Sequence, residues 1–178
     1  LIYLKIMENL KKYISEINDF PKDGIVFKDI NPIYKEPKIW NKLMLPLQKL
    51  VSMNNVDYIA GIESRGFISG SALAFTNSIG FIPIRKPNKL PGKVIGINYK
   101  LEYGEDRLEI QKDSFRKDSK VLIIDDLLAT GGTASAAGKL IRKAGGDLVG
   151  YAFLIELTNL SGRKCLDNKS IVESVIKY

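Results

Sequence analysis

The chain has 178 residues, of which 45% are hydrophobic and 26% are charged, as expected for a globular protein with one substantial core. It contains no histidine and one cysteine, which excludes an internal disulfide, a histidine-based metal site and a serine–histidine triad. The net charge of +7 suits an anionic ligand, a nucleic acid or simply a lysine-rich proteome, and the lysines are spread along the chain as on solvated surfaces. No apolar run approaches the roughly 20 residues of a membrane span.

The chain starts with Leu1 to Ile6, ahead of Met7. This stretch is shorter than the apolar core of a signal peptide, so we expect Met7 to be the natural start and residues 1–6 to be an extension. From Glu8 to Asn18 apolar side chains recur at helical spacing, which predicts a helix. These side chains are Leu10, Tyr13, Ile14 and Ile17.

The segment from Phe20 to Pro32 is predicted to be irregular by its prolines and glycine, yet it carries apolar side chains. It is either a cover packed on the core or a wall for a flat apolar ligand. In the second case Phe27 would stack on a ring, and the backbone amide and carbonyl of Val26 would bond the edge of a heterocycle.

Lys38 to Met53 predicts a second helix, which Pro46 should kink or divide. A buried strand is expected from Asp57 to Ile62, followed by a polar glycine turn and a helix from Phe67 to Ser78. Ligands bind at the carboxyl ends of parallel strands. Arg65, in that turn, is therefore either a surface residue that caps the loop or a candidate ligand for an anionic group.

Phe81 to Ile84 predicts another strand, which leads into a basic loop. Four cations lie in that loop, at Arg85, Lys86, Lys89 and Lys93. Such a loop is either merely solvated or part of a polyanion site, and its place at a strand end favours the polyanion. Residues 94–111 alternate around the turn Tyr103–Asp106, which predicts a hairpin and a candidate lid carrying Glu102 near its tip.

The sequence from Lys120 to Thr133 reads K-V-L-I-I-D-D-L-L-A-T-G-G-T. Val121 to Ile124 predicts a strand of a parallel sheet that is buried on both faces. We expect this strand to end at Asp125 and Asp126. A helix is expected from Ala134 to Lys143. The glycines allow the backbone to approach a ligand closely, and free N–H groups at the start of a helix bind phosphate. The two neighbouring carboxylates suit the hydroxyls of a ribose diol. The loop lacks the lysine of a nucleotide-triphosphate P-loop and the spacing of a dinucleotide fold.

Two further strands are predicted, a buried one over Leu148–Leu157 and a last one over Ile171–Ile176, at an edge of the sheet. No linker, repeat or low-complexity stretch separates these elements. The pattern predicts a single α/β domain over residues 1–178, with a mostly parallel, twisted sheet flanked by helices.

Val121 to Thr133 resembles the phosphoribosyl-diphosphate (PRPP) motif of type I phosphoribosyltransferases, and the chain from Met7 to Tyr178 resembles the adenine phosphoribosyltransferase family. The other motifs follow in the family's order: F-P-x-x-G-I-x-F-x-D-I at Phe20–Ile30, E-S-R-G-F at Glu63–Phe67, I-R-K at Ile84–Lys86, K-L-P-G at Lys89–Gly92, Y-x-L-E-Y-G at Tyr99–Gly104 and E-L-T at Glu156–Thr158.

The resemblance implies the roles of particular residues. Val26 and Phe27 would hold adenine, with Lys28 beside it where many relatives have arginine, so a bidentate contact is not expected there. Glu102 would be the catalytic acid or base. PRPP or AMP would be bound by a larger set, in which Asp125 and Asp126 meet the ribose and residues 129–133 the 5-phosphate: Arg65, Arg85, Lys86, Lys89, Tyr103, Asp125, Asp126, Ala129, Thr130, Gly131, Gly132 and Thr133.

The implied reaction is adenine plus PRPP giving AMP and diphosphate in purine salvage. Mg²⁺ would be carried mainly by the diphosphate, near Asp125 and Asp126. The resemblance further implies a cytoplasmic homodimer with Lys89 acting across the interface, a base-binding hood at about residues 7–34 and a flexible catalytic loop at about residues 93–110.

Two other functions stay open. One is transfer to another base, such as hypoxanthine, guanine, xanthine or orotate, against which the motif at Phe20–Ile30 argues. The other is a PRPP-binding regulator that binds RNA or DNA. No helix-turn-helix precedes the core and the cations gather beside the expected diphosphate site, so we expect no nucleic-acid partner and no membrane partner.

Overall fold

A computed structural model describes residues 10–100 and 104–178. The chain divides into two compact units, one that ends at Pro46 and one from Leu47 to Tyr178. No helix among the described residues is long and apolar enough to cross a membrane. A single domain and the expected limits of the hood and the flexible loop stay predictions.

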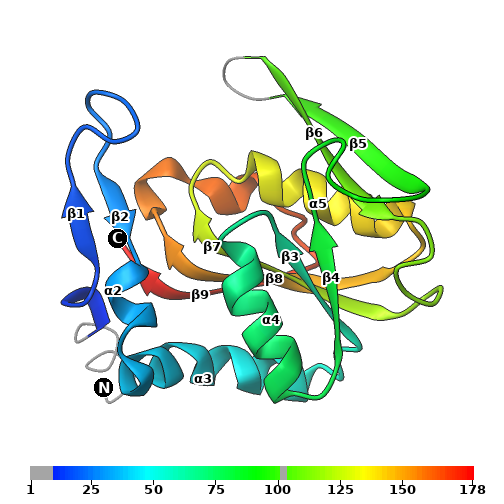
Figure 1. The fold of residues 1–178 in the computed structure, drawn as a ribbon, viewed down its shortest axis with the longest axis horizontal. Coiled ribbons are helices and arrows are strands. Elements are labelled where there is room, and N and C mark those ends of the chain that lie inside the picture. Colours follow the sequence, from blue (N-terminus) through cyan, green and yellow to red (C-terminus); the bar gives the residue numbers. More distant parts are fainter. Residues whose placement is uncertain (1–9, 101–103) are drawn as a thin grey trace. The chain divides into compact units, whose positions relative to one another are not determined.

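The N-terminal unit contains a small antiparallel sheet of β1 (Ser15–Ile17) and β2 (Phe27–Asp29), drawn in blue in Figure 1. A short helix, α2 (Asn31–Tyr34), follows, and then α3 (Pro37–Met53), which begins in this unit. The expected helix over Glu8–Asn18 is wrong: within the described residues, helix ends at Lys11 and β1 follows. A helix this short is marginal without packing, and pairing with β2 satisfies the same backbone groups.

Two other expectations for this part of the chain need correction. The segment Phe20–Pro32 is not wholly irregular, because it includes β2 and the start of α2. The helix expected over Lys38–Met53 is confirmed as α3; Pro46 does not divide it, whereas a kink at Pro46 stays a prediction. A proline removes only one backbone hydrogen bond, which the packing of an amphipathic helix can offset.

The described residues of the second unit form a five-stranded sheet in which every neighbouring pair is parallel, in the order β4-β3-β7-β8-β9. This confirms the expected α/β class. The strands are β3 (Tyr58–Ile62), β4 (Gly80–Ile84), β7 (Lys120–Leu128), β8 (Asp147–Glu156) and β9 (Ile171–Lys177). As predicted, the last strand lies at an edge.

Two helices cover this sheet on opposite sides (Figure 1). Helix α4 (Gly66–Thr76) connects β3 to β4, and α5 (Gly132–Lys143) connects β7 to β8. The two connections run outward in opposite directions from the middle of the sheet, so right-handed crossovers place the helices on opposite faces. The point where the direction changes lies between β3 and β7, which is where ligands bind in sheets of this kind.

An antiparallel hairpin of β5 (Val94–Lys100) and β6 (Glu105–Gln111) stands beside α5, as predicted for residues 94–111. The expected turn Tyr103–Asp106 is wrong at its end, because β6 already includes Glu105 and Asp106. Their pairing with Lys100 and Tyr99 extends the ladder toward the tip. Two short 3₁₀ helices that the sequence did not indicate, Thr158–Leu160 and Gly162–Cys165, follow β8.

Strand β7 runs through the centre of the sheet. Its residues Val121–Ile124 are 0% exposed, as a strand covered on both faces should be. The expectation that Asp125 and Asp126 end the strand is wrong, because β7 continues to Leu128. Asp125, Leu127 and Leu128 pair with β8, so the ladder continues past the two polar side chains.

Helix α4 approaches β7 closely at Gly66. A β-carbon built on Gly66 would lie 2.8 Å from the carbonyl oxygen of Ile124 and 3.1 Å from Oδ1 of Asp125. These separations are shorter than ordinary contacts, so a side chain there has no room. The glycine therefore allows the start of α4, and Arg65 immediately before it, to lie against the carboxyl end of β7.

We predict that Gly66→Ala lowers the free energy of unfolding by about 1–3 kcal/mol, because the added methyl group must push α4 away from β7. Thermal and urea unfolding would measure the change. Ser71→Ala, on the exposed side of the same helix, is the matched control and should stay within about 0.5 kcal/mol of the wild type. Equal stability of the two variants would contradict the close contact at Gly66.

Candidate active site

A cavity of about 250 Å³ lies at the carboxyl ends of β3 and β7 in the second unit. Its walls come from the ends of these two strands, the basic loop after β4, and the glycine loop before α5. The lining residues are Ile62, Glu63, Lys86, Asp125, Leu127, Leu128, Ala129, Thr130, Gly131, Gly132, Thr133 and Ala134. Among the residues proposed for PRPP, the structure thus brings together Lys86, Asp125 and the whole loop 129–133.

The glycine loop is shaped for an anion. Gly131 has a φ of +84°, and a β-carbon there would lie 2.3 Å from the carbonyl oxygen of Gly162, so both conformation and space require glycine. The first turn of α5 contains no acidic residue. Its unpaired N–H groups and the positive end of the helix dipole therefore favour a negatively charged ligand in the cavity.

The two neighbouring acids at the end of β7 have different surroundings. Asp126 is 5% exposed, and its Oδ2 lies 2.7 Å from Nη2 of Arg65. Asp125 lines the cavity, and its Oδ1 accepts the backbone N–H of Asp126 at 2.9 Å. The pair joins a buried carboxylate to a guanidinium that stays 32% exposed.

Burial raises the pKa of Asp125 well above its ordinary value, and the charge of Asp126 raises it further. Burial also raises the pKa of Asp126, and the nearby Arg65 guanidinium offsets this only in part. Two carboxylates held together in a low dielectric resist ionising at the same time. Ionisation of both carboxylates therefore lowers the stability of the folded chain.

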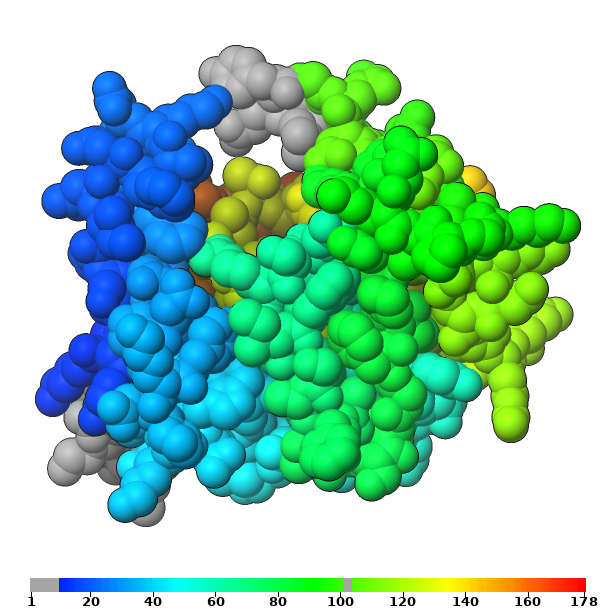
Figure 2. All heavy atoms as spheres, viewed as in Figure 1, coloured from blue at the N-terminus to red at the C-terminus, as the bar shows by residue number. Residues whose placement is uncertain are grey.

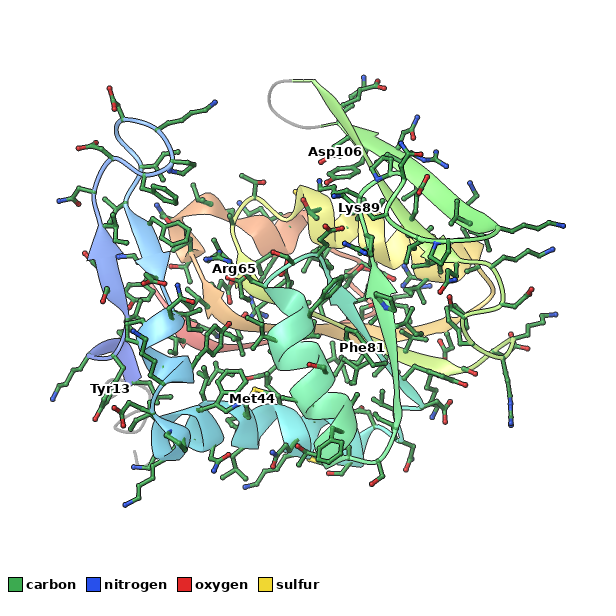
Figure 3. The ribbon with its side chains drawn as sticks, viewed as in Figure 1. Tyr13, Met44, Arg65, Phe81, Lys89 and Asp106 are labelled. Carbon is green, nitrogen blue, oxygen red and sulfur yellow. The ribbon has the colours of Figure 1, made fainter. Side chains whose placement is uncertain are left out.

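The proposed diphosphate-binding cations are each held by an acid of the protein or lie in solvent. Besides the Arg65 pair, Arg85 contacts the Glu63 carboxylate through Nε at 3.2 Å and Nη2 at 3.3 Å. Lys86 forms an ion pair with Asp106 of β6. Lys89, labelled in Figure 3, is exposed on the basic loop.

Glu63 is a site residue to which the sequence analysis gave no role. Its carboxylate accepts bonds from Arg85 and, at 3.0 Å, from the backbone N–H of Lys86. The hydrogen bond from Arg85 lowers the pKa of Glu63, against the opposing effect of burial. A carboxylate that ends the strand beside a basic loop was a usable signal, because strand ends and charged loops meet at one edge of a parallel sheet.

The residues expected to bind adenine lie in the N-terminal unit. Val26 is 44% exposed, and the ring of Phe27 meets that of Phe20 edge to face at 5.1 Å. Lys28 pairs with Glu16 across the β1–β2 ladder. The proposed acid or base Glu102, and Tyr103, lie outside the described residues.

Whether the cavity can hold a magnesium ion depends on the oxygen ligands that its side chains provide. The described residues contain no group of three or more Cys, Asp or Glu side chains that would hold a metal ion. Mg²⁺ is usually bound through one or two carboxylates together with substrate phosphates. Asp125 at the cavity wall suits that mode, whereas Asp126 is already paired with Arg65.

We predict that Asp125→Asn stabilises the fold increasingly as the pH rises. The pKa of Asp125 is higher in the folded than in the unfolded chain, so the folded chain binds more protons between the two values and stability falls as the pH rises through that window. The variant lacks this loss, so at pH 7.5 it should unfold at a higher temperature than the wild type.

Thermal unfolding at pH 4 and pH 7.5 would measure the difference, which should shrink at the lower pH. Asp113→Asn, which removes an exposed carboxylate, is the control and should change Tm little at either pH. A variant at Asp125 that is less stable than the wild type at pH 7.5 would contradict the prediction.

Comparisons with known proteins agree with this geometry. Residues 30–176 match the family model of the phosphoribosyl transferase domain. An adenine phosphoribosyltransferase of Prochlorococcus marinus (strain NATL1A) is 73% identical over 97% of this chain and 100% of its own length. The adenine phosphoribosyltransferase structure from Rhodothermus marinus has a TM-score of 0.94 at 43% identity, covering 98% of this chain and 99% of that one.

A third relative is a solved structure from Saccharomyces cerevisiae, complexed with adenine and an imino-altritol bisphosphate. It has a TM-score of 0.90 at 39% identity and covers 97% of this chain and 99% of that one. These similarities run over nearly the whole length of both partners. The chain belongs to the phosphoribosyltransferase family and, within it, to the adenine phosphoribosyltransferases.

Proposed function

We propose that this protein transfers the 5-phosphoribosyl group of PRPP to adenine, which gives AMP and diphosphate in purine salvage. The observation that carries the proposal is the cavity in which loop 129–133, Asp125 and Lys86 face the same space. It combines a phosphate-binding helix start with a carboxylate for ribose hydroxyls and a cation. The family to which the chain belongs supports the same reaction.

The 5-phosphate of PRPP would occupy the glycine loop. Backbone N–H groups at the start of α5 and the hydroxyls of Thr130 and Thr133 would donate to its oxygens. Asp125, which lines the cavity, and its neighbour Asp126 would accept hydrogen bonds from the ribose hydroxyls. Ala129, Gly131 and Gly132 would contribute backbone alone.

The diphosphate would meet the four cations Arg65, Arg85, Lys86 and Lys89. In the structure the first three already pair with acids, so the diphosphate would share or replace these partners. The exchange is feasible because partly exposed ion pairs contribute only about 0–1 kcal/mol each. Magnesium would be carried mainly by the diphosphate, near Asp125 and Asp126, and would neutralise part of its charge.

Adenine would be bound by the N-terminal unit. Phe20, Ile25 and Val26 are 50%, 44% and 44% exposed, an apolar surface that suits a flat heterocycle. Phe27 would stack on the ring, and the backbone of Val26 would bond its edge. Lys28 would contribute a point charge without the bidentate geometry of arginine. The yeast relative solved with adenine supports the choice of base.

In the reaction itself, N9 of adenine would attack C1 of the ribose as the bond from C1 to the diphosphate oxygen breaks. The electron pair leaves with the diphosphate, and the cations named above stabilise it. Positive charge develops on the ribosyl ring, and Glu102 would take the proton that adenine loses at N7. Tyr103, on the same turn, would close against the donor.

The protein would work as a homodimer in the cytoplasm, with Lys89 reaching the partner's site. Support for the dimer comes from the outer surface of α4, which is visible in Figure 2. Ile68 and Phe75 of this helix are 45% and 88% exposed, and large exposed apolar side chains on one helix are typical of an interaction surface.

We predict that the purified protein releases diphosphate from PRPP and Mg²⁺ when adenine is present. Reactions with hypoxanthine, with guanine and without a base are the controls, and they should release little, because the base-binding segment is that of the adenine family. Release with another base would contradict the assignment of residues 20–30 as an adenine-binding segment. Binding of PRPP without release for any base would favour the regulatory alternative.

We further predict that Glu102→Gln lowers kcat by roughly 10²-fold, the usual contribution of a positioned acid or base. Steady-state kinetics with adenine and PRPP would measure it. Glu105→Gln, which removes an exposed carboxylate on the same hairpin, is the control and should keep kcat within about threefold. Turnover of the Glu102 variant at the wild-type rate would remove this residue from the mechanism.

A further inference from the structure

We propose that Asp106 is a positioning residue that holds the Lys86 ammonium group at the wall of the phosphate cavity, and that Tyr99 extends this arrangement to Thr133. The proposal rests on the proposed function, because it takes the cavity to bind the phosphates of the donor. It adds two residues of the hairpin stem to the machinery that receives them.

Four side chains from different elements meet at this point. Lys86 forms an ion pair with Asp106, and its Nζ donates to the Tyr99 hydroxyl at 3.2 Å. The Tyr99 hydroxyl donates to Oδ2 of Asp106 at 3.0 Å and lies 3.3 Å from Oγ1 of Thr133. Lys86 and Thr133 line the cavity, whereas Tyr99 and Asp106 do not. The hairpin residues therefore support the cavity wall from behind.

The hairpin register places the two supporting residues side by side. Tyr99 of β5 and Asp106 of β6 are directly opposite each other in the ladder, so their side chains extend from the same face of the hairpin. Figure 3 labels Asp106 at this end of the hairpin, above Lys89 of the basic loop. The pair thus lies on the stem of the hairpin, where β5 and β6 are paired.

Lys86 needs such support because its side chain is long and 40% exposed. A free lysine loses up to about 2 kcal/mol of rotamer entropy when it is fixed by a ligand. Here Asp106 and Tyr99 accept two of its three N–H groups, and the ammonium lies 5.7 Å from the centre of the Tyr99 ring. One N–H group remains for a phosphate oxygen, from a side chain that is already ordered.

The charge states agree with this arrangement. Burial alone would lower the pKa of Lys86, but the hydrogen bonds to Asp106 and Tyr99 outweigh it and raise the pKa. Burial alone would raise the pKa of Asp106, and the hydrogen bonds from Lys86, the Arg107 backbone and Tyr99 lower it instead. Both groups are therefore charged at neutral pH, as an ammonium that meets a phosphate must be.

The test is the kinetics of Asp106→Asn. Without the charged partner, Lys86 loses its orientation, so KM for PRPP should rise about tenfold, the equivalent of one hydrogen bond to a charged group. The kcat value and KM for adenine should stay within about threefold, a split that general damage to the fold would not produce. Tyr99→Phe should raise KM for PRPP by a smaller factor, and it serves as the second variant if Asp106→Asn does not fold.

Two controls make the result specific. Glu105→Gln removes the same charge from the neighbouring position of β6, which pairs with Lys100, and should leave KM for PRPP unchanged. In a Lys86→Met background, Asp106→Asn should change KM for PRPP by less than about twofold, because Asp106 acts only through Lys86. An equal effect in both backgrounds would overturn the proposal, as would a lower KM in the single variant, which would make Asp106 a competitor for Lys86.

Calorimetric binding of magnesium diphosphate separates this proposal from the proposed function, because it needs no turnover. Weaker binding to Asp106→Asn than to the wild type would support the positioning role even if adenine proves not to be the acceptor. Equal binding to both proteins would overturn it. Absence of binding to the wild type would instead refute the proposed diphosphate site, and the positioning role with it.

Discussion

The ion pair between Arg65 and buried Asp126 is the interaction on which the site depends. It joins the start of α4 to the end of β7. Asp126 is buried while Arg65 stays 32% exposed, so removal of Arg65 would leave a buried carboxylate without its cation. The contact exists only because Gly66 lets the helix approach the backbone of β7.

Three of the cations proposed to bind the diphosphate have acidic partners in the structure without a ligand. These pairs are Arg65 with Asp126, Arg85 with Glu63 and Lys86 with Asp106. Unpaired, these cations would repel one another in a partly buried space. The partly exposed pairs are weak enough for a diphosphate to share or replace them. The raised pKa values of Asp125 and Asp126 are the remaining cost of this arrangement, as is common where a site is built for binding rather than stability.

Three parts of the site come from one edge of the sheet. The glycine loop (residues 129–133) follows β7, Glu63 follows β3 and the basic loop follows β4. These three strands are neighbours in the order β4-β3-β7. The hairpin contacts the basic loop through Asp106, which pairs with Lys86, and the glycine loop through Tyr99, which lies beside Thr133. A shift of the hairpin by one residue would turn both side chains to the other face.

The sequence by itself determined most of the strands and helices of the second unit and the need for glycine in the loop before α5. The apolar run Val121–Ile124 indicates a covered strand and Gly131 indicates a tight turn, because hydrophobic pattern and turn conformation can be recognised from a few adjacent residues. The adenine phosphoribosyltransferase family was also recognisable from motifs in order. Tertiary structure alone decided that residues 15–17 form a strand rather than a helix and that β7 runs past its acids. Only the tertiary structure shows that Arg65 pairs with Asp126 and Lys86 with Asp106. These partners are distant in the sequence and meet only after the crossovers and the hairpin register have formed.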